Sequence, residues 1–174
     1  MSKMFMVDLQ ACTGCRICEV VCSFEKEKAV RPSKSRIRIL KMDEYGMDVP
    51  VICQHCQSPP CVDVCPVNAI VRLEGESRVV LHQDRCIGCR ACTFVCPYGA
   101  ISIDVDTGKS IKCDACGGEP QCVKLCPKKA LYYDDPEVIN TLKRKGQMGF
   151  ILKSYLKAQD CGGGSSDSSP WKQG

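Results

Sequence analysis

The chain has 174 residues, 44% of them hydrophobic and 6% aromatic, and its formal net charge is +4. Seventeen residues are cysteines, and without them only about a third of the chain is apolar. A chain this poor in large apolar side chains excludes a core built by hydrophobic packing alone, and bound metal supplies part of the folding free energy in such cases.

Sixteen of the cysteines form four groups of four. The first and third groups follow the spacing C-x2-C-x2-C-x3-C, and the second and fourth lengthen only the middle gap. This is the spacing of bacterial two-cluster ferredoxins, in which each iron of a [4Fe–4S] cluster takes one thiolate. The pattern predicts four clusters and a protein that transfers electrons. The groups are Cys12, Cys15, Cys18, Cys22; Cys53, Cys56, Cys61, Cys65; Cys86, Cys89, Cys92, Cys96; and Cys113, Cys116, Cys122, Cys126.

The elements around the groups repeat along the chain. A short strand is expected before a ligand loop, a helical turn between the last two cysteines, and an extended segment after a closing Cys-Pro. The first group departs from this repeat, with Ser23 in place of proline, and is followed by residues 36–40, whose period of two predicts a half-buried strand. The other strands are expected at 4–9, 49–52, 70–73, 79–82, 101–104 and 131–133.

The last two cysteines of each group are four residues apart, which places them on one face of a helical turn. They are too far apart to bind neighbouring irons of one cubane easily. The fourth cysteine of each group is therefore expected to bind a different cluster from the first three, as in two-cluster ferredoxins. Four groups then make two ferredoxin-like units, but the spacing alone leaves open which groups pair.

Beyond the last group the pattern changes. A helix is expected near 137–144 and a break at Gly146 and Gly149. An amphipathic helix follows, which packs either on the chain's own ferredoxin units or on another subunit. The Gly/Ser-rich residues 161–174 are expected to be disordered. The apolar stripe, a candidate partner-binding surface, consists of Met148, Ile151, Leu152, Tyr155 and Leu156.

Two other uses of the cysteines compete with iron–sulfur binding. A disulfide scaffold needs an oxidising compartment, yet the first eight residues lack the apolar segment of a secretory signal. Zinc is the stronger rival, because C-x2-C is half of a zinc knuckle. Zinc sites normally pair two such units across a dozen or more residues, however, and need no third cysteine and no following proline.

Polar residues near the groups are candidates for tuning. His55 lies inside the second group, where it either hydrogen-bonds to a cluster sulfur or faces solvent or a partner. Lysines near the fourth group would favour a reduced cluster, although solvated surface positions are the expectation. No dinucleotide fingerprint, Walker loop or nucleophile–base pair is present, so no catalytic site for organic substrates is expected. The lysines are Lys112, Lys124, Lys128 and Lys129.

Four groups in this order, with Cys53-Gln-His-Cys56-Gln-Ser-Pro-Pro-Cys61 second, resemble the four-cluster electron-transfer subunits of molybdenum and tungsten oxidoreductases. That family includes the iron–sulfur subunits of formate dehydrogenase and dimethyl sulfoxide reductase. The resemblance covers about residues 4–134. The opening segment 12–24 and Ser35-Arg36-Ile37-Arg38 are most similar to the small subunits of tungsten aldehyde oxidoreductases and of the related benzoyl-CoA reductase complexes.

The resemblance implies an α+β fold of two ferredoxin-like units, one inserted in the other. Residues 1–48 and 108–135 would form the outer unit and 49–107 the inserted unit, followed by a helical extension at 136–160 and a disordered tail at 161–174. The first group would pair with the fourth, and the second with the third. The implied ligand sets are Cys12, Cys15, Cys18, Cys126; Cys22, Cys113, Cys116, Cys122; Cys53, Cys56, Cys61, Cys96; and Cys65, Cys86, Cys89, Cys92.

The resemblance also implies a function. The chain would be a cytoplasmic subunit without a membrane segment that relays electrons between a tungsten or molybdenum catalytic subunit and a flavoprotein or ferredoxin. Self-association through the last helix is a second expectation. Four clusters add about −8 to the net charge, so the basic residues balance them and a nucleic-acid partner is not expected. The alternatives are a free-standing diffusible polyferredoxin and a zinc-binding structural adaptor.

Overall fold

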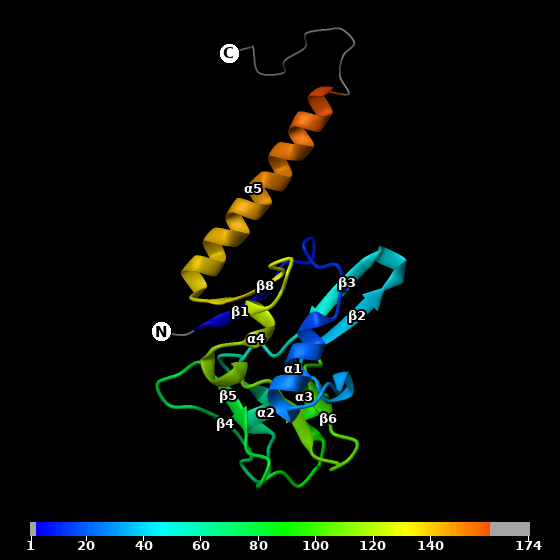
Figure 1. Cartoon of the computed structure of the whole chain (residues 1–174). Coiled ribbons are helices and arrows are strands. Elements are labelled where there is room, and N and C mark those ends of the chain that lie inside the picture. The colour runs from blue at the N-terminus through cyan, green and yellow to red at the C-terminus, as the bar shows by residue number, and fades with distance from the viewer. Residues whose placement is uncertain (1–2, 161–174) are drawn as a thin grey trace. The chain divides into compact units, whose positions relative to one another are not determined.

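The computed structural model describes residues 3–160 (Figure 1); in the last helix it describes the side chains as far as Gly149, and that of Leu152. The chain divides into a first unit that ends at Pro136 and a second that begins at Glu137. The described part of the first unit is α+β, with short strands and short helices, as expected. Its expected division into an outer and an inserted ferredoxin-like unit stays a proposal.

The strands of the first unit form two-stranded antiparallel sheets. One sheet joins the two ends of the unit, with Met4 opposite Asp134 and Val7 opposite Leu131. The other three sheets are hairpins of consecutive strands. The pairs are β1 (Met4–Val7) with β8 (Leu131–Asp134), β2 (Arg38–Met42) with β3 (Met47–Val51), β4 (Ile70–Arg72) with β5 (Val79–Leu81), and β6 (Ile101–Ile103) with β7 (Ser110–Lys112).

The expected half-buried strand near residues 36–40 is confirmed, although β2 begins at Arg38. Ile37 and Ile39 are buried, whereas Leu40 is half exposed. Alternation of this kind follows from the pleat, which points successive side chains to opposite faces. The face of Ile37 and Ile39 therefore belongs to the core.

Each cysteine group carries a short helix near its third and fourth cysteines. The helix of the first group contacts that of the fourth, and the helix of the second group contacts that of the third (Figure 1). The four groups are thus brought together in two pairs. The helices are α1 (Ile17–Glu27), α2 (Pro60–Asp63), α3 (Ala91–Val95) and α4 (Gln121–Lys124).

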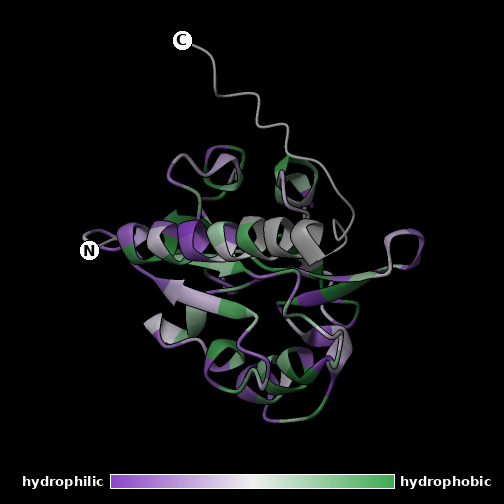
Figure 2. Cartoon of the chain, turned by 90° about the horizontal axis from the view of Figure 1, so that it is seen from above, coloured by the Kyte–Doolittle hydropathy of each residue, from purple (hydrophilic) through white to green (hydrophobic). Residues whose placement is uncertain are grey.

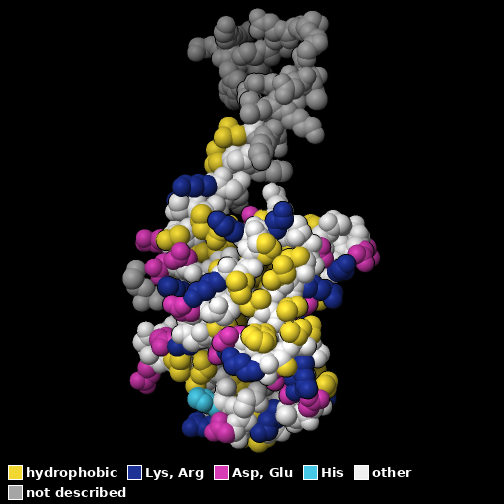
Figure 3. Space-filling model, in the orientation of Figure 1, with side chains coloured by type: hydrophobic (Ala, Val, Ile, Leu, Met, Phe, Trp, Pro, Cys, Tyr) yellow, Lys and Arg dark blue, Asp and Glu magenta, His cyan; other side chains and the backbone are white. Residues whose placement is uncertain are grey.

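Cysteines supply much of the buried core, as the composition predicts. The larger cluster is centred on Phe5, Ile37, Ile52 and Leu131, together with five buried cysteines. The smaller contains Ile70, Val79 and Ile101, together with Cys61 and Cys92. On the face drawn in Figure 3, basic side chains lie interspersed with acidic ones.

The second unit is described as one helix, α5 (Pro136–Asp160). The expected break at Gly146 and Gly149 is wrong. A glycine inside a helix costs only about 1 kcal/mol, which its helix-favouring lysine, arginine, leucine and glutamine neighbours offset. Hydrophilic and hydrophobic residues alternate along its described turns (Figure 2).

Two residues of the expected apolar stripe are described, and both are about half exposed: Met148 is 54% and Leu152 is 55% exposed. The side chains of Ile151, Tyr155 and Leu156 lie outside the described residues, as does the tail 161–174. Among the described helices, none combines the length and the apolar character needed to span a bilayer.

Four cysteine-lined cavities as the candidate functional site

Four cavities of the first unit are each lined by four cysteines. In every cavity three cysteines come from one sequence group and one from another. Each expected ligand set thus lines one cavity, and binding of a cluster there stays a prediction. The first cavity has Cys12, Cys15, Cys18 and Cys126; the second has Cys22, Cys113, Cys116 and Cys122; the third has Cys53, Cys56, Cys61 and Cys96; the fourth has Cys65, Cys86, Cys89 and Cys92.

The short helices explain why the groups exchange their last cysteine. In α1, Cys18 lines the first cavity and Cys22 the second. Four residues of helix rise about 6 Å, so one helix supplies two neighbouring cavities. The α4 segment does the reverse, with Cys122 in the second cavity and Cys126 in the first. The α2 and α3 segments link the third and fourth cavities in the same way.

The loop between the first two cysteines of each group contains a left-handed residue directly before the second cysteine. Its φ is +61° at Gly14, +48° at His55, +72° at Gly88 and +55° at Ala115. A residue in this conformation turns the chain tightly, so that both flanking thiols lie at one cavity. Glycine adopts it without the steric cost that other residues carry, which explains the glycine in the first and third groups.

Gly88 offers a test of this loop. A Cβ at Gly88 would lie 2.7 Å from the carbonyl oxygen of Gly108, in addition to the left-handed φ. Gly88→Ala should therefore lower the iron content of the fourth cavity and the unfolding temperature. Gly75 has a similar φ of +73° but no atom within 4 Å of an added Cβ, so Gly75→Ala should cost only the conformational strain of about 1–2 kcal/mol. Equal effects of the two changes on iron and on unfolding would contradict this account.

A second repeated turn surrounds the fourth cysteine of three groups. After Cys-Pro, the chain adopts a left-handed conformation two residues later, and the buried alanine that follows donates its backbone N–H to the cysteine sulfur. Such N–H···S hydrogen bonds stabilise a thiolate and adjust the potential of the bound cluster. The distances are 3.2 Å from Ala69 to Cys65, 3.4 Å from Ala100 to Cys96 and 3.3 Å from Ala130 to Cys126.

In the first group, the sulfur of the last cysteine, Cys22, accepts its hydrogen bond from a more distant part of the chain. Because α1 continues past Ser23 to Glu27, no turn can return directly after Cys22. The backbone N–H of Arg36 reaches the Cys22 sulfur instead, at 3.2 Å. Where proline is absent after the last cysteine, the N–H donor to its sulfur therefore lies farther along the chain than in the other three groups.

Burial makes several of these thiols poor acids without a metal. It raises the pKa of Cys18 to about 12 and that of Cys61 to about 11, with a smaller contribution from Glu19 to the first. Burial also raises the pKa of Cys113 and Cys122. Bound iron would reverse this preference, because a metal cation favours the deprotonated form of a coordinating thiol. Cys65 differs, since backbone N–H groups of the turn after it outweigh its burial and lower its pKa.

The donor sets fit a cubane. Each cavity offers four soft thiol ligands, and the walls around them are mainly apolar. The sixteen cysteines within the described range are free thiols. Nowhere in residues 3–160 do three or more His, Cys, Asp or Glu side chains converge around a single metal ion. A cubane has no such requirement, because each thiolate binds a different iron.

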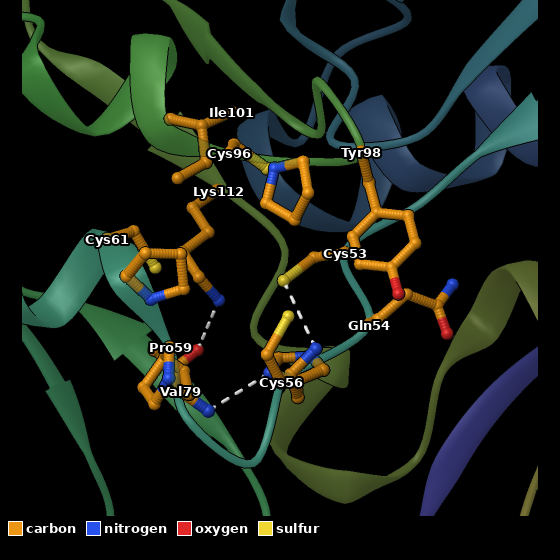
Figure 4. Close-up of a pocket in the computed structure, with 13 residues that line it drawn as sticks. Cys53, Gln54, Cys56, Pro59, Cys61, Val79, Cys96, Tyr98, Ile101 and Lys112 are labelled. Atoms are coloured by element: carbon orange, nitrogen blue, oxygen red, sulfur yellow. Dashed lines mark hydrogen bonds between the residues drawn. The ribbon is translucent and has the colours of Figure 1, made fainter.

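The third cavity also contains polar groups (Figure 4). His55 is only 5% exposed, and its Nδ1 accepts a hydrogen bond from the Val79 N–H at 3.0 Å. Of the alternatives left open for His55, the solvent-facing position is therefore ruled out, and its role in tuning a cluster stays a prediction. Burial, with the nearby Lys112 charge, lowers the pKa of His55 to about 3, so the ring is neutral. Its ring stacks on Phe5 with the centroids 6.0 Å apart.

Lys112 is the other polar group of the third cavity (Figure 4). It is 7% exposed, and its Nζ donates to the carbonyl oxygens of Val79 at 2.5 Å and Cys113 at 3.0 Å. The expectation of a solvated surface position is wrong for this lysine. Lys124, Lys128 and Lys129 are exposed, as expected.

One further contact had no signal in the cysteine spacing. The Ser110 hydroxyl lies 3.2 Å from the Cys92 sulfur, inside the fourth cavity. The alanine four residues after the last cysteine of three groups does recur in the sequence, although the recurrence does not reveal its role as an N–H donor. Among the sixteen cysteines, Cys15 and Cys89 are exposed, and they line the first and the fourth cavity.

Comparison with known proteins agrees with these features. Residues 45–136 match the family model of the 4Fe-4S dicluster domain, and residues 9–25 match that of a 4Fe-4S binding domain. The polyferredoxin-like subunit of the aliphatic sulfonate oxidoreductase of Pyrococcus furiosus is 43% identical over 115 residues, 66% of each chain. An uncharacterized ferredoxin of Methanocaldococcus jannaschii is 39% identical over 160 residues, covering 91% of this chain and 88% of its own.

Among solved structures, a chain of the active site complex BamBC of benzoyl coenzyme A reductase, in complex with benzoyl-CoA, is 26% identical. The match covers 89% of this chain and 96% of that one, with a TM-score of 0.46. The resemblance to iron–sulfur subunits of oxidoreductases, drawn from the cysteine groups, is confirmed by the family match and the polyferredoxin-like relative. The chain therefore belongs to the 4Fe-4S dicluster-domain ferredoxins, and it is an electron-transfer iron–sulfur protein related to the polyferredoxin subunits of oxidoreductases.

Proposed function

We propose that the chain holds four [4Fe–4S] clusters, one in each cavity, and relays electrons between a tungsten or molybdenum catalytic subunit and a second redox subunit. The catalytic subunit would be of the aldehyde oxidoreductase type, and the second subunit a flavoprotein or ferredoxin. In this proposal the four cavities form one connected row, and the elements that neighbouring cavities share are the observation that carries it.

The row follows from shared elements. The α1 and α4 segments connect the first cavity to the second, and α2 and α3 connect the third to the fourth. Between the two pairs, Cys53 of the third cavity and Cys113 of the second pack in the same buried cluster. When bound, each cluster takes up one electron and passes it on. The protein's part is to hold the four ligand sets in sequence and to bury most of the cysteines wholly or in part.

The two ends of the row are the places where partners would exchange electrons. Cys15 in the first cavity and Cys89 in the fourth are exposed. Beside them, Ile17 and Ile87 line these cavities and are 39% and 64% exposed. An apolar, exposed wall at a redox site suits a surface that a partner covers. Exposed cysteines at two of the four cavities favour a relay with two points of electron exchange over four independent sites.

The two-unit arrangement belongs to the same proposal. The contacts of α1 with α4 and of α2 with α3 support a pairing of the first group with the fourth and of the second with the third. In that arrangement, residues 49–107 interrupt a ferredoxin-like unit made by 1–48 and 108–135. The relay then consists of two halves, joined near Cys53 and Cys113.

Anaerobic purification from the native source tests the proposal. We expect the chain to elute with a tungsten- or molybdenum-containing protein at fixed stoichiometry, and we expect addition of an aldehyde to reduce its clusters. The alternative is a free-standing polyferredoxin that diffuses between partners. Elution of the iron–sulfur chain alone, in a form that either partner reduces only on collision, would favour that alternative.

Helix α5 supplies a more specific test of assembly. Met148 and Leu152 lie four residues apart, on one helical face, and both are half exposed. Combined Met148→Asp and Leu152→Asp substitutions should weaken association with the catalytic subunit or with a second copy of the chain, without loss of iron. Lys143→Asp, a charge change at an exposed position on the opposite side of the helix from this stripe, is the matched control and should leave assembly intact. Iron loss with unchanged assembly would place α5 in the chain's own core.

A further inference from the structure

The basic side chains that line the cavities differ in how they are neutralised. At the second cavity, Lys26 pairs with Asp114 at 2.6 Å and Arg36 pairs with Glu27 at 2.7 Å. Each of these cations therefore has a carboxylate that cancels most of its charge. At the third cavity, the hydrogen bonds of the Lys112 ammonium go to carbonyl oxygens, and none of the carboxylates whose side chains the structure describes lies within ion-pair distance of it.

The other cavities offer no equivalent charge. At the first cavity, Arg16 and Lys128 are exposed, where water and salt screen them. No lysine or arginine is among the residues described around the fourth cavity. The other buried lysine, Lys34, pairs with Asp104 at 3.2 Å. Lys112 is thus a buried and uncompensated positive charge at one particular cavity.

The geometry of Lys112 holds this charge in place. The carbonyls of Val79 and Cys113 orient the ammonium but do not neutralise it. Burying an unpaired ammonium is unfavourable, so an anionic group in the cavity that it lines would stabilise it. Four thiolates and a cubane core supply that negative charge, and reduction adds one unit more.

His55 supplies a second donor to the same cavity. The Val79 N–H occupies Nδ1, so the proton of the neutral ring resides on Nε2. This Nε2 is buried, and no residue in the described part of the chain accepts its hydrogen bond. Because His55 lines the third cavity, the acceptor that suits this N–H is a sulfur atom of the group that fills the cavity.

We propose that Lys112 and the Nε2–H of His55 raise the reduction potential of the cluster in the third cavity. An electron inside the relay would then occupy this cluster in preference to the others. This inference depends on the proposed function. Positive charge and hydrogen-bond donors stabilise the more negative, reduced cluster. The cluster gains one electron, a neighbouring cluster loses one, and no covalent bond changes. Both donors are anchored on Val79, which accepts from Lys112 and donates to His55.

A redox titration of the intact chain, followed by electron paramagnetic resonance, tests the proposal. Cys96→Ser perturbs a ligand of the third cavity and so assigns its signal. Lys112→Gln retains an amide donor for the two carbonyls but removes the charge. At an ambient potential equal to the original midpoint, the reduced-to-oxidised ratio of this cluster should fall at least tenfold, which is about 59 mV for one electron. His55→Phe retains a ring against Phe5 and should shift the ratio in the same direction.

Lys128→Gln, which removes an exposed charge beside the first cavity, is the control and should leave the third-cavity ratio unchanged. A Lys112→Gln protein with full iron and an unchanged ratio overturns the inference. Loss of about four irons per chain in Lys112→Gln would make Lys112 a structural support and overturns the tuning role as well. An unaltered chain that lacks four clusters would contradict the proposed function, which is a different result from either of these.

Discussion

Anaerobically purified protein is expected to be brown and to contain about 16 iron and about 16 sulfide per chain, because each of the four proposed ligand sets would hold one cubane. Removal of this iron should unfold the first unit. Cysteines form a large part of both buried clusters, and the sheets around them have only two strands each. Two-stranded sheets are marginal on their own. The ligand sets therefore replace the hydrophobic packing that the chain lacks.

The measurement combines iron and sulfide analysis with circular dichroism and small-angle scattering before and after chelation under oxidising conditions. The radius of gyration should rise about twofold or more when the chain loses its compact state. Bleaching and unfolding should follow one time course. Zinc in place of iron, iron near half the expected content, or a compact chain after complete iron removal would each contradict this prediction.

The second large effect is expected from Cys22→Ser. Cys22 lines the second cavity with Cys113, Cys116 and Cys122, about ninety residues away in the sequence. The substitution should therefore remove or alter the second-cavity cluster, and iron should fall to about three quarters of its full value if that cubane is lost. A serine hydroxyl is a harder and weaker ligand for iron than a thiolate.

Cys161→Ser is the matched control, because Cys161 belongs to none of the four groups; it should leave iron and spectra unchanged. Cys126→Ser is the reciprocal variant and should damage the first cavity, which contains Cys12, Cys15 and Cys18. Spectroscopy decides between the alternatives. Damage from Cys22→Ser confined to the cluster of Cys12, Cys15 and Cys18 would rule out the exchange of last cysteines between groups.

Most of what could be predicted from the sequence follows from the spacing of the cysteine ligands. A cubane constrains its ligand loops so strongly that most of the short strands and helical turns around them could be located from the sequence. The strand before the fourth group, β7, was not among those expected. The strands expected at 70–73, 101–104 and 131–133 are β4, β6 and β8, with ends that differ by one residue. The iron–sulfur class follows from the same spacing, and the family match confirms it.

Long-range contacts explain the burial of Lys112, which was expected at the surface, and of His55, whose position was left open. Lys112 is buried because β7 brings it to the carbonyl of Val79, a contact between residues 33 positions apart that no local pattern encodes. His55 is buried for the same reason, since its Nδ1 also meets the backbone of Val79. The expected break in α5 is an error of another kind, because here a local signal was overrated. Two glycines were given more weight than their small helix penalty justifies.

The pairing of β1 with β8 has a consequence for how the protein is made. The chain is synthesised from its N-terminus, so Cys12, Cys15 and Cys18 emerge long before Cys126, which lines the same cavity. The sets of the third and fourth cavities are complete once Cys96 has been synthesised. The ligand sets of the first and second cavities are complete only after the fourth cysteine group has been synthesised. Strand β8 (Leu131–Asp134) then pairs with β1 and closes the unit. Cofactor insertion can thus begin in the middle of the chain while the earliest thiols are still unprotected.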